Sequence, residues 1–385
     1  MYSLLLAIIY LAFISLGLPD SLLGSAWPTI YADMNIPISY MGIVTLIISS
    51  GTIVSSLLSD RVVSKFGVRR VTAVSIFLTS AALFGFSTST AFYQLCLWGI
   101  PYGMGAGSID AALNNYVALH YDSRHMSWLH CFWGVGTIIS PYVMSLALTN
   151  SEWTAGYRII SLIQLLIMIA VILSRPLWKV NSPVGEEQTR IEPLGIRGVA
   201  KIKGVFPVLI GFTCYCALEA TTTLWASSYF EGAFDMSKDQ VAALGSLTFI
   251  GITVGRFLSG FISDRVGDTK MIRLGAAIAG IGILMIAIPH PTIAIVGFVI
   301  IGLGCAPIYP SIIHSTPTRF GKEKSQSIIG IQMASAYLGS SLMPPLFGVI
   351  ADFINIRLLP LFIGFFTVLM IVMLTVADKK TRAYN

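Results

Sequence analysis

Long apolar runs recur from one end of the chain to the other, and this repetition constrains the fold more than any other feature. Each run is about twenty residues long, enough for a helix to cross the ~30 Å hydrocarbon core of a bilayer. Helices satisfy their own backbone hydrogen bonds in lipid, and the runs are too long and continuous for barrel strands. Only 11% of the residues are charged, against about a quarter in soluble domains. The sequence therefore predicts a helical membrane protein.

We expect an all-α polytopic fold with twelve transmembrane helices in two pseudo-symmetric six-helix bundles. The predicted spans are 4–29, 38–58, 71–88, 93–119, 126–148, 156–174, 204–229, 239–262, 271–288, 293–317, 326–348 and 358–376. The first run does not resemble a signal peptide, because it lacks a basic start and is interrupted by Pro19 and Asp20.

The Lys and Arg residues are distributed unevenly between the loops. Of 24 such residues, 21 flank one set of alternate loops, and only Arg158, Lys238 and Arg357 flank the other. The positive-inside rule then predicts cytoplasmic termini and a cytoplasmic central loop. The net charge of +6 has this topological origin, so we expect no nucleic-acid partner. Short loops and the absence of an N-x-S/T sequon favour a bacterial inner membrane.

The chain reads as two similar halves. We expect an N-terminal bundle over 1–174, a cytoplasmic linker over 175–203 and a C-terminal bundle over 204–385. Residues match between the halves at nearly constant separations, which indicates a duplication typical of transporters. The matches are Gly51 with Gly255 and Asp60-Arg61 with Asp264-Arg265 (204 residues apart), Gly136 with Gly339 and Pro141 with Pro344 (203), and Gly103-x-Gly105 with Gly302-x-Gly304 (199).

The loop after the eighth span carries a family resemblance. The stretch from Gly260 through Asp264 and Arg265 to Gly267 resembles the loop signature G-x-x-x-D-R-x-G of the major facilitator superfamily. The first-half copy, at Asp60 and Arg61, is looser, because extra residues separate it from the following glycine. The resemblance implies two gating loops that pack against a neighbouring helix end and regulate opening on the cytoplasmic side.

Three carboxyls lie well inside predicted spans: Asp20, Asp110 and Glu219. Ionisable groups at this depth cost roughly 2.5–3.5 kcal/mol or more and mark functional sites. Burial disfavours the charged form of a carboxyl, so such a group can bind and release the proton that drives transport. Asp20 has the alternative of capping a helix broken at Pro19, and Glu219 that of pairing with a basic residue.

The two aspartates share a local pattern. Asp20 and Asp110 each follow a glycine by three residues, in G-x-x-D-x-x-L, and their spans begin the two three-helix units of the first half. An inverted repeat would make them equivalent. Arg256 is the lone cation placed within a span, and we interpret it as a structural partner, with binding of an anionic substrate as the alternative.

Polar and aromatic residues in the same spans provide groups that suit a sugar, which needs donors and acceptors for its hydroxyls and an aromatic face for its C–H side. Each residue also has a purely structural alternative, such as a hydrogen bond to a neighbouring helix. The predicted substrate-binding residues are Asn114, Asn115, His130, Trp133, Trp225, Tyr309, His314 and Gln332.

A narrower resemblance covers mainly the first half. Asp20, Asp110 and the stretch from Asn114 through His130 to Trp133 resemble the fucose–proton symporter group and its sodium-dependent glucose transporter relatives. In that group, the two acidic positions bind sugar and carry the proton. The span 4 position holds Asp where Glu is common, which leaves the exact substrate open.

The sequence thus predicts a secondary active transporter that works by alternating access. We expect proton-coupled symport of a sugar or similar small polar solute by a monomer in the lipid bilayer, with no cofactor or metal and with Na⁺ as the other candidate coupling ion. A proton-driven exporter of drugs or metabolites is the alternative. An enzyme is not expected, because no H-E-x-x-H, G-x-S-x-G or P-loop motif is present.

Overall fold

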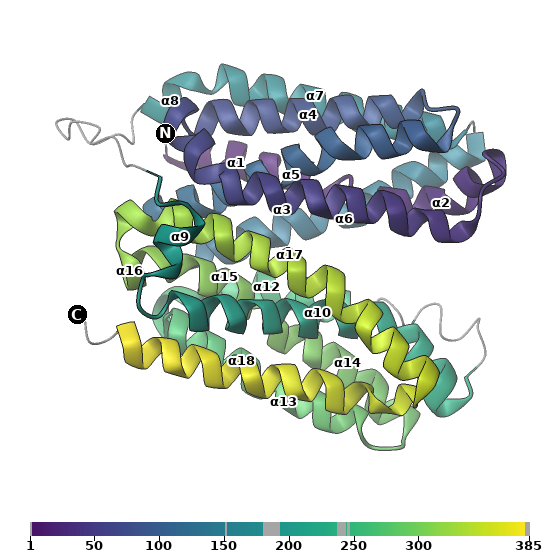
Figure 1. Cartoon of the computed structure of the whole chain (residues 1–385), viewed down its shortest axis with the longest axis vertical. Helices are drawn as coiled ribbons and strands as arrows, with labels where there is room; N and C mark the ends of the chain where they lie inside the picture. The colour runs from purple at the N-terminus through teal and green to yellow at the C-terminus, as the bar shows by residue number, and fades with distance from the viewer. Residues whose placement is uncertain (1, 151, 180–192, 237–243, 245–246, 382–385) are drawn as a thin grey trace. The chain divides into compact units, whose positions relative to one another are not determined.

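The structure is a computed structural model that describes residues 2–150, 152–179, 193–236, 244 and 247–381 (Figure 1). Residues 180–192 of the predicted linker, and 239–246 of the eighth predicted span apart from residue 244, lie outside the described residues. Within the described ranges all regular structure is helical. The elements are α1 (Tyr2–Gly17), α2 (Leu22–Asp33), η1 (Ile38–Tyr40), α3 (Met41–Phe66), α4 (Val68–Ser87), α5 (Phe92–His120), α6 (Ser123–Asn150), α7 (Trp153–Leu173), α8 (Arg175–Lys179), α9 (Gly195–Ala200), α10 (Val205–Phe234), α12 (Leu247–Val266), α13 (Asp268–Ile286), α14 (Pro291–Cys305), α15 (Ile308–His314), α16 (Thr316–Phe320), α17 (Lys322–Phe353), η2 (Ile356–Leu358) and α18 (Leu359–Thr381).

The chain divides into two compact units. Unit 1 comprises residues 1–116 and 129–196, and unit 2 comprises residues 117–128 and 197–385. The boundary at 196/197 falls inside the predicted linker. A short segment of the first half, residues 117–128, packs with unit 2 and contains the turn between α5 and α6.

Helices lie at all twelve predicted spans, and ten of those described are long and apolar enough to cross a membrane. Of the two other long helices, α5 is described over its whole length, whereas α12 covers only the described part of the eighth predicted span. Both helices carry charged residues of the predicted sites or their partners, with Asp110 on α5 and with Arg256 and Asp264 on α12.

The distribution of side chains on α4 suits lipid and not water. This helix buries Ser75, Thr79 and Ser80 while it exposes Phe77 and Phe84. Ser80 and Ser161 of α7 hydrogen-bond each other, each hydroxyl to the other's backbone carbonyl at 2.8–2.9 Å. Helix association in membranes relies on such small residues and interhelical hydrogen bonds, so α4 presents its large apolar residues outward as a spanning helix does.

One close backbone contact recurs in both units. A Cβ on Gly136 of α6 would collide with the carbonyl oxygen of Ile14 on α1, and a Cβ on Gly339 of α17 would collide with the carbonyl oxygen of Thr213 on α10. The glycines are 203 residues apart and their partners 199 residues apart. The same helix-to-helix contact in each unit is the three-dimensional form of the internal repeat.

The ends of α3 and α12 show where the extra residues of the first-half loop signature lie. Both helices end at a glycine with positive φ, +76° at Gly67 and +82° at Gly267, and these residues are 200 positions apart. The sequence matches Asp60-Arg61 with Asp264-Arg265 at 204. The four extra residues are about one helical turn, so Asp60 and Arg61 lie within α3, one turn further from its end than Asp264 and Arg265 lie from the end of α12.

Candidate functional site

The first span is broken next to Asp20. Helix α1 ends at Gly17 and α2 begins at Leu22. Pro19 has no backbone N–H, so the carbonyl of Ser15 cannot receive its usual helical bond. The side-chain amide of Gln164, fully buried on α7, donates to that carbonyl from Nε2 at 2.6 Å. Gln164 thereby satisfies the acceptor that the break releases.

Asp20 lies in this break and reaches two other helices. Tyr102 of α5 donates its hydroxyl to Oδ1 at 3.1 Å, and Trp133 of α6 donates its indole N–H to Oδ2 at 2.8 Å. Asp20 is exposed while Tyr102 is buried. The neighbouring Ser21 hydroxyl donates to the Thr137 carbonyl at 2.5 Å. The hydrogen bonds of the Asp20 carboxylate thus connect three helices instead of capping α2.

The helices that position this carboxylate touch backbone to backbone. A Cβ on Gly17 would collide with the carbonyl oxygen of Trp133, one of the residues that bonds Asp20, and Gly136 contacts Ile14 in the same way. Glycine at both positions therefore lets α1 and α6 approach closely beside the site. The distance between Asp20 and Trp133 depends on this contact.

Asp110 belongs to a second, buried polar group. The Asn114 amide donates to Asp110 Oδ1 at 2.7 Å, and Asn114 Oδ1 lies 3.0 Å from His130 Nε2. Asp110 is 5% exposed and Asn114 is 0% exposed. His130 lies on α6, three residues before Trp133. Carboxylate, amide and imidazole form a continuous chain from α5 to α6.

The glycines that precede Asp20 and Asp110 each allow a close contact between two helices. Gly17, three residues before Asp20, packs α1 against α6, whereas Gly107, three residues before Asp110, packs α5 against the Thr52 backbone of α3. In an inverted repeat, the first span corresponds to the fourth and the second to the fifth. A contact of span 1 with span 5 then corresponds to one of span 4 with span 2. The observed contacts follow that rule.

Glu219 of unit 2 has a different environment. Arg256 Nη2 lies 3.4 Å from Glu219 Oε1, and the Tyr215 hydroxyl donates to Oε2. The Arg256 side chain is 4% exposed and that of Glu219 20%. Arg256 is therefore the basic partner that the alternative interpretation of Glu219 requires.

The other predicted residues of unit 2 have partners in three different places. Tyr309 packs its ring against Phe212 and Tyr215, beside Glu219. Trp225 donates to the Pro344 carbonyl at 2.9 Å and so joins α10 to α17.

His314 and Gln332 have partners elsewhere. Gln332 accepts from the Thr316 hydroxyl at 3.0 Å, and His314 contacts Asp268 at the start of α13. Gln332 thus bonds the first residue of α16, and His314 precedes that residue by two positions. In unit 1, Asn115 is buried one residue beyond Asn114.

The two loop signatures have different partners. Asp264 accepts from the backbone N–H and the Nε of Arg124, at 2.9 and 3.1 Å, at the first turn of α6. Asp60 is buried, accepts from its neighbour Arg61 at 2.7 Å and lies 3.4 Å from the Gly195 amide. The second-half copy thus packs against a helix end, as the resemblance implies, while Arg265 is exposed.

Sequence reasoning missed Tyr102 and Gln164. Tyr102 precedes Asp110 by eight residues, which places both on similar faces of α5, and this spacing is a usable signal. The signal for Gln164 is indirect. Pro19 leaves the carbonyl of Ser15 without its helical N–H partner, so a buried side-chain donor is needed there. Nothing local identifies α7 as the helix that supplies that donor.

Comparison with known proteins assigns the chain to a family. The model of the Major Facilitator Superfamily matches residues 9–237 and again 208–385. The chain therefore belongs to the major facilitator superfamily and is a multi-pass membrane transporter.

Several relatives and structures resemble the chain over almost its whole length. The glucose/mannose transporter GlcP of Bacillus subtilis is 20% identical over 386 residues, which cover 97% of this chain and 94% of that protein. The bypass of stop codon protein 6 of Saccharomyces cerevisiae is 22% identical over 91% of this chain and 77% of that protein. Among solved structures, FucP in the outward conformation has a TM-score of 0.77 at 14% identity, covering 96% of this chain and 98% of that one. The proton:xylose symporter XylE, bound to 6-bromo-6-deoxy-D-glucose, has a TM-score of 0.80 at 13% identity, covering 96% and 94%.

Proposed function

We propose that this transporter is a proton-coupled symporter of a sugar or similar polyol, with Asp20 as the coupling carboxyl. The carrying observation is the setting of Asp20, an exposed carboxylate in a helix break whose two oxygens accept bonds from Tyr102 and Trp133. Both donors are neutral, and among the described residues no Lys, Arg or His forms an ion pair with Asp20. Its charge is therefore free to change with proton binding.

The two donors respond differently when Asp20 binds a proton. An indole N–H only donates, whereas a phenol hydroxyl donates or accepts. A proton on Oδ1 can therefore be donated to Tyr102, which reverses that hydrogen bond, while Trp133 continues to donate to Oδ2. The Tyr102 hydrogen is then available to another acceptor, such as a substrate hydroxyl. Proton binding and substrate binding would be linked through Tyr102.

The sugar assignment rests on the groups around Asp20. Trp133 provides an aromatic ring, and the Asp110–Asn114–His130 group adds amide and imidazole polarity on the same two helices. The names of GlcP, FucP and XylE suggest hexoses, deoxyhexoses and pentoses as the first compounds to test. Glu219 is a less suitable coupling group, since Arg256 offsets its charge.

The experiment is internal pH in proteoliposomes loaded with a pH-sensitive dye, in sodium-free buffer, challenged with hexoses, 6-deoxyhexoses, pentoses and polyols. We expect lumenal acidification by one compound class, and its absence in Asp20→Asn. Asp33→Asn is the matched control, because Asp33 also accepts an indole N–H, from Trp153 at 2.8 Å, but lies at the end of α2.

Equal acidification by Asp20→Asn and the parent protein would refute the role of Asp20. If no compound acidifies the lumen while a known symporter responds in parallel, proton–sugar symport is refuted. Repeating the panel with sodium, and then with lipophilic cations under an outward proton flux, would distinguish sodium coupling from export.

A further inference from the structure

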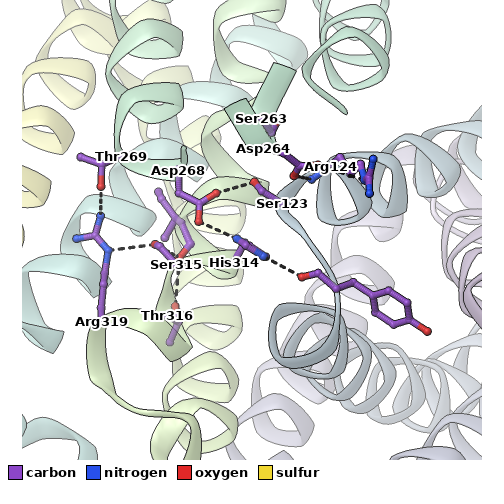
Figure 2. A network of polar contacts seen from close by, with 12 residues as sticks. Ser123, Arg124, Ser263, Asp264, Asp268, Thr269, His314, Ser315, Thr316 and Arg319 are labelled. Carbon is purple, nitrogen blue, oxygen red and sulfur yellow. Dashed lines mark hydrogen bonds and ion pairs between the residues drawn. The ribbon is translucent and has the colours of Figure 1, made fainter. Parts of the chain in front are cut away.

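His314 is the last residue of α15 (Figure 2). Its Nδ1 is 2.7 Å from Asp268 Oδ2, and its Nε2 is 3.0 Å from the carbonyl oxygen of Tyr121. All three residues belong to unit 2. The side chains of His314 and Asp268 are 18% and 16% exposed, so water competes little for either contact.

Both neighbours of the imidazole are hydrogen-bond acceptors. A backbone carbonyl and an ionised carboxylate only accept, and a neutral imidazole carries one N–H. A neutral His314 can therefore satisfy only one of the two contacts. The doubly protonated ring donates to both, so the observed geometry selects the imidazolium form.

The two contacts fasten the turn between α5 and α6. Tyr121 is held through His314, and the Ser123 hydroxyl donates at 2.6 Å to Asp268 Oδ1, the other oxygen of the same carboxylate. Arg124 adds its contacts to Asp264 at the end of α12. Figure 2 shows Ser123 and His314 directed to Asp268, with Arg124 beside Asp264. Asp268 thus contacts both His314, which holds Tyr121, and Ser123.

The charges around His314 favour a proton on the ring. Asp268 of α13 and Asp264 of α12 are the acidic groups facing it, and Arg124 of α6 is paired with Asp264. Arg319 of α16 is directed to Asp378 at 2.6 Å, and His125 of α6 packs against the rings of Tyr121 and Trp128. The charged group in direct contact with the His314 ring is therefore the carboxylate of Asp268.

We propose that His314 and Asp268 form a proton-binding site that fastens the α5–α6 turn to unit 2 when it is protonated and loosens the turn when the proton leaves. A fall in pH tightens the attachment, and a rise in pH removes one of the two hydrogen bonds. The turn joins α5, which carries Asp110 and Asn114, to α6, which carries His130 and Trp133. The site adjoins loops predicted to be cytoplasmic, so the proton that it binds would come from the cytoplasm.

The protonation state can be measured directly on the full chain in nanodiscs labelled with ¹⁵N-histidine. The sequence has five histidines, and the spectrum of His314→Gln identifies the signal that is lost. We expect both nitrogens of His314 to be protonated at neutral pH and one proton to be lost as pH rises. A ring that carries a single N–H at pH 6 would overturn the proposal.

The attachment itself is tested by hydrogen–deuterium exchange of residues 117–128, compared with intrinsic exchange rates at each pH. In the parent protein we expect protection to fall by about tenfold as His314 loses its proton, a factor equal to about 1.4 kcal/mol. His314→Gln should show the lower protection at both pH values, because the contacts of Ser123 and Arg124 remain. His290→Gln, at an exposed site before α14, should behave like the parent protein.

Ser123→Ala provides a second variant in case His314→Gln does not fold. It keeps His314 and loses only the direct bond to Asp268, so protection should drop at low pH while its pH dependence remains. Protection of 117–128 that does not change with pH in the parent protein would refute the switch. Neither measurement uses transport, so the outcome is independent of the proposed symport.

Discussion

Asp20 of unit 1 and Glu219 of unit 2 stand at corresponding places but in different surroundings. The backbone contact of Ile14 with Gly136 recurs as that of Thr213 with Gly339, so α1 and α10 correspond at a separation of 199, and Asp20 and Glu219 are also 199 apart. Asp20 lies in a helix break beside neutral donors, whereas Glu219 lies within the continuous helix α10 beside Arg256. The residue corresponding to Pro19 is Leu218.

The difference separates two uses of a carboxyl in a membrane. A carboxylate paired with a buried guanidinium is held in its charged form, since removing either partner strands the other charge. A carboxylate whose hydrogen-bond donors are neutral can bind a proton without leaving a partner charge unpaired. One duplicated position thus supplies a group suited to change its charge in unit 1 and a fixed ion pair in unit 2.

The largest expected effect comes from breaking the ion pair. Arg256→Gln should destabilise the protein by about 3 kcal/mol, because it leaves the carboxylate of Glu219 largely buried without its partner. The double variant Glu219→Gln, Arg256→Gln should recover much of that loss, as thermal unfolding in detergent would show. Equal unfolding temperatures for the single and double variants would contradict an obligatory pair.

Alanine at the paired glycines tests what the units share. Gly136→Ala and Gly339→Ala should each destabilise by about 2–3 kcal/mol, because the added methyl meets a backbone carbonyl that cannot move aside. The same unfolding measurement should give similar losses for both. A large loss at one position and none at the other would show that the two contacts are not equivalent.

The helix break can be tested by a double-mutant cycle. Gln164→Leu should cost about 2 kcal/mol, because it leaves the Ser15 carbonyl buried without a donor. Pro19→Ala restores the missing N–H, so Gln164→Leu should cost less in that background. Additive losses in the unfolding free energies would mean that Gln164 does not serve the break. Uptake assays of the same variants should show reduced coupling when the break is altered, with Gln164→Glu as a donor-deficient comparison.

The smallest change of stability is expected at Asp20. Asp20→Asn retains one acceptor oxygen and should lower stability by at most about 1 kcal/mol, yet accumulation of substrate against a gradient should disappear. Exchange of labelled for unlabelled substrate should persist, since it needs no net proton movement. Loss of exchange together with accumulation would instead place Asp20 in substrate binding alone.

The sequence predicted the spans and the three intramembrane carboxyls, because run length and isolated charge are local properties. It did not predict which side chains meet. Tyr102 and Gln164 reach their partners across 82 and 149 residues, and such contacts depend on how each helix is rotated about its axis. His314 illustrates the same limit, since its position inside an apolar span suggested substrate binding, whereas at the end of α15 it contacts Asp268.

The composition of α5 has a consequence for biosynthesis. The translocon releases helices into lipid according to their apolarity, and α5, which the structure describes over its whole length, is less apolar than the ten spanning helices. Helix α3 fits against it at a glycine, since Gly103 of α5 contacts the Ile48 backbone of α3. Helix α5 should therefore enter the bilayer together with the earlier α3.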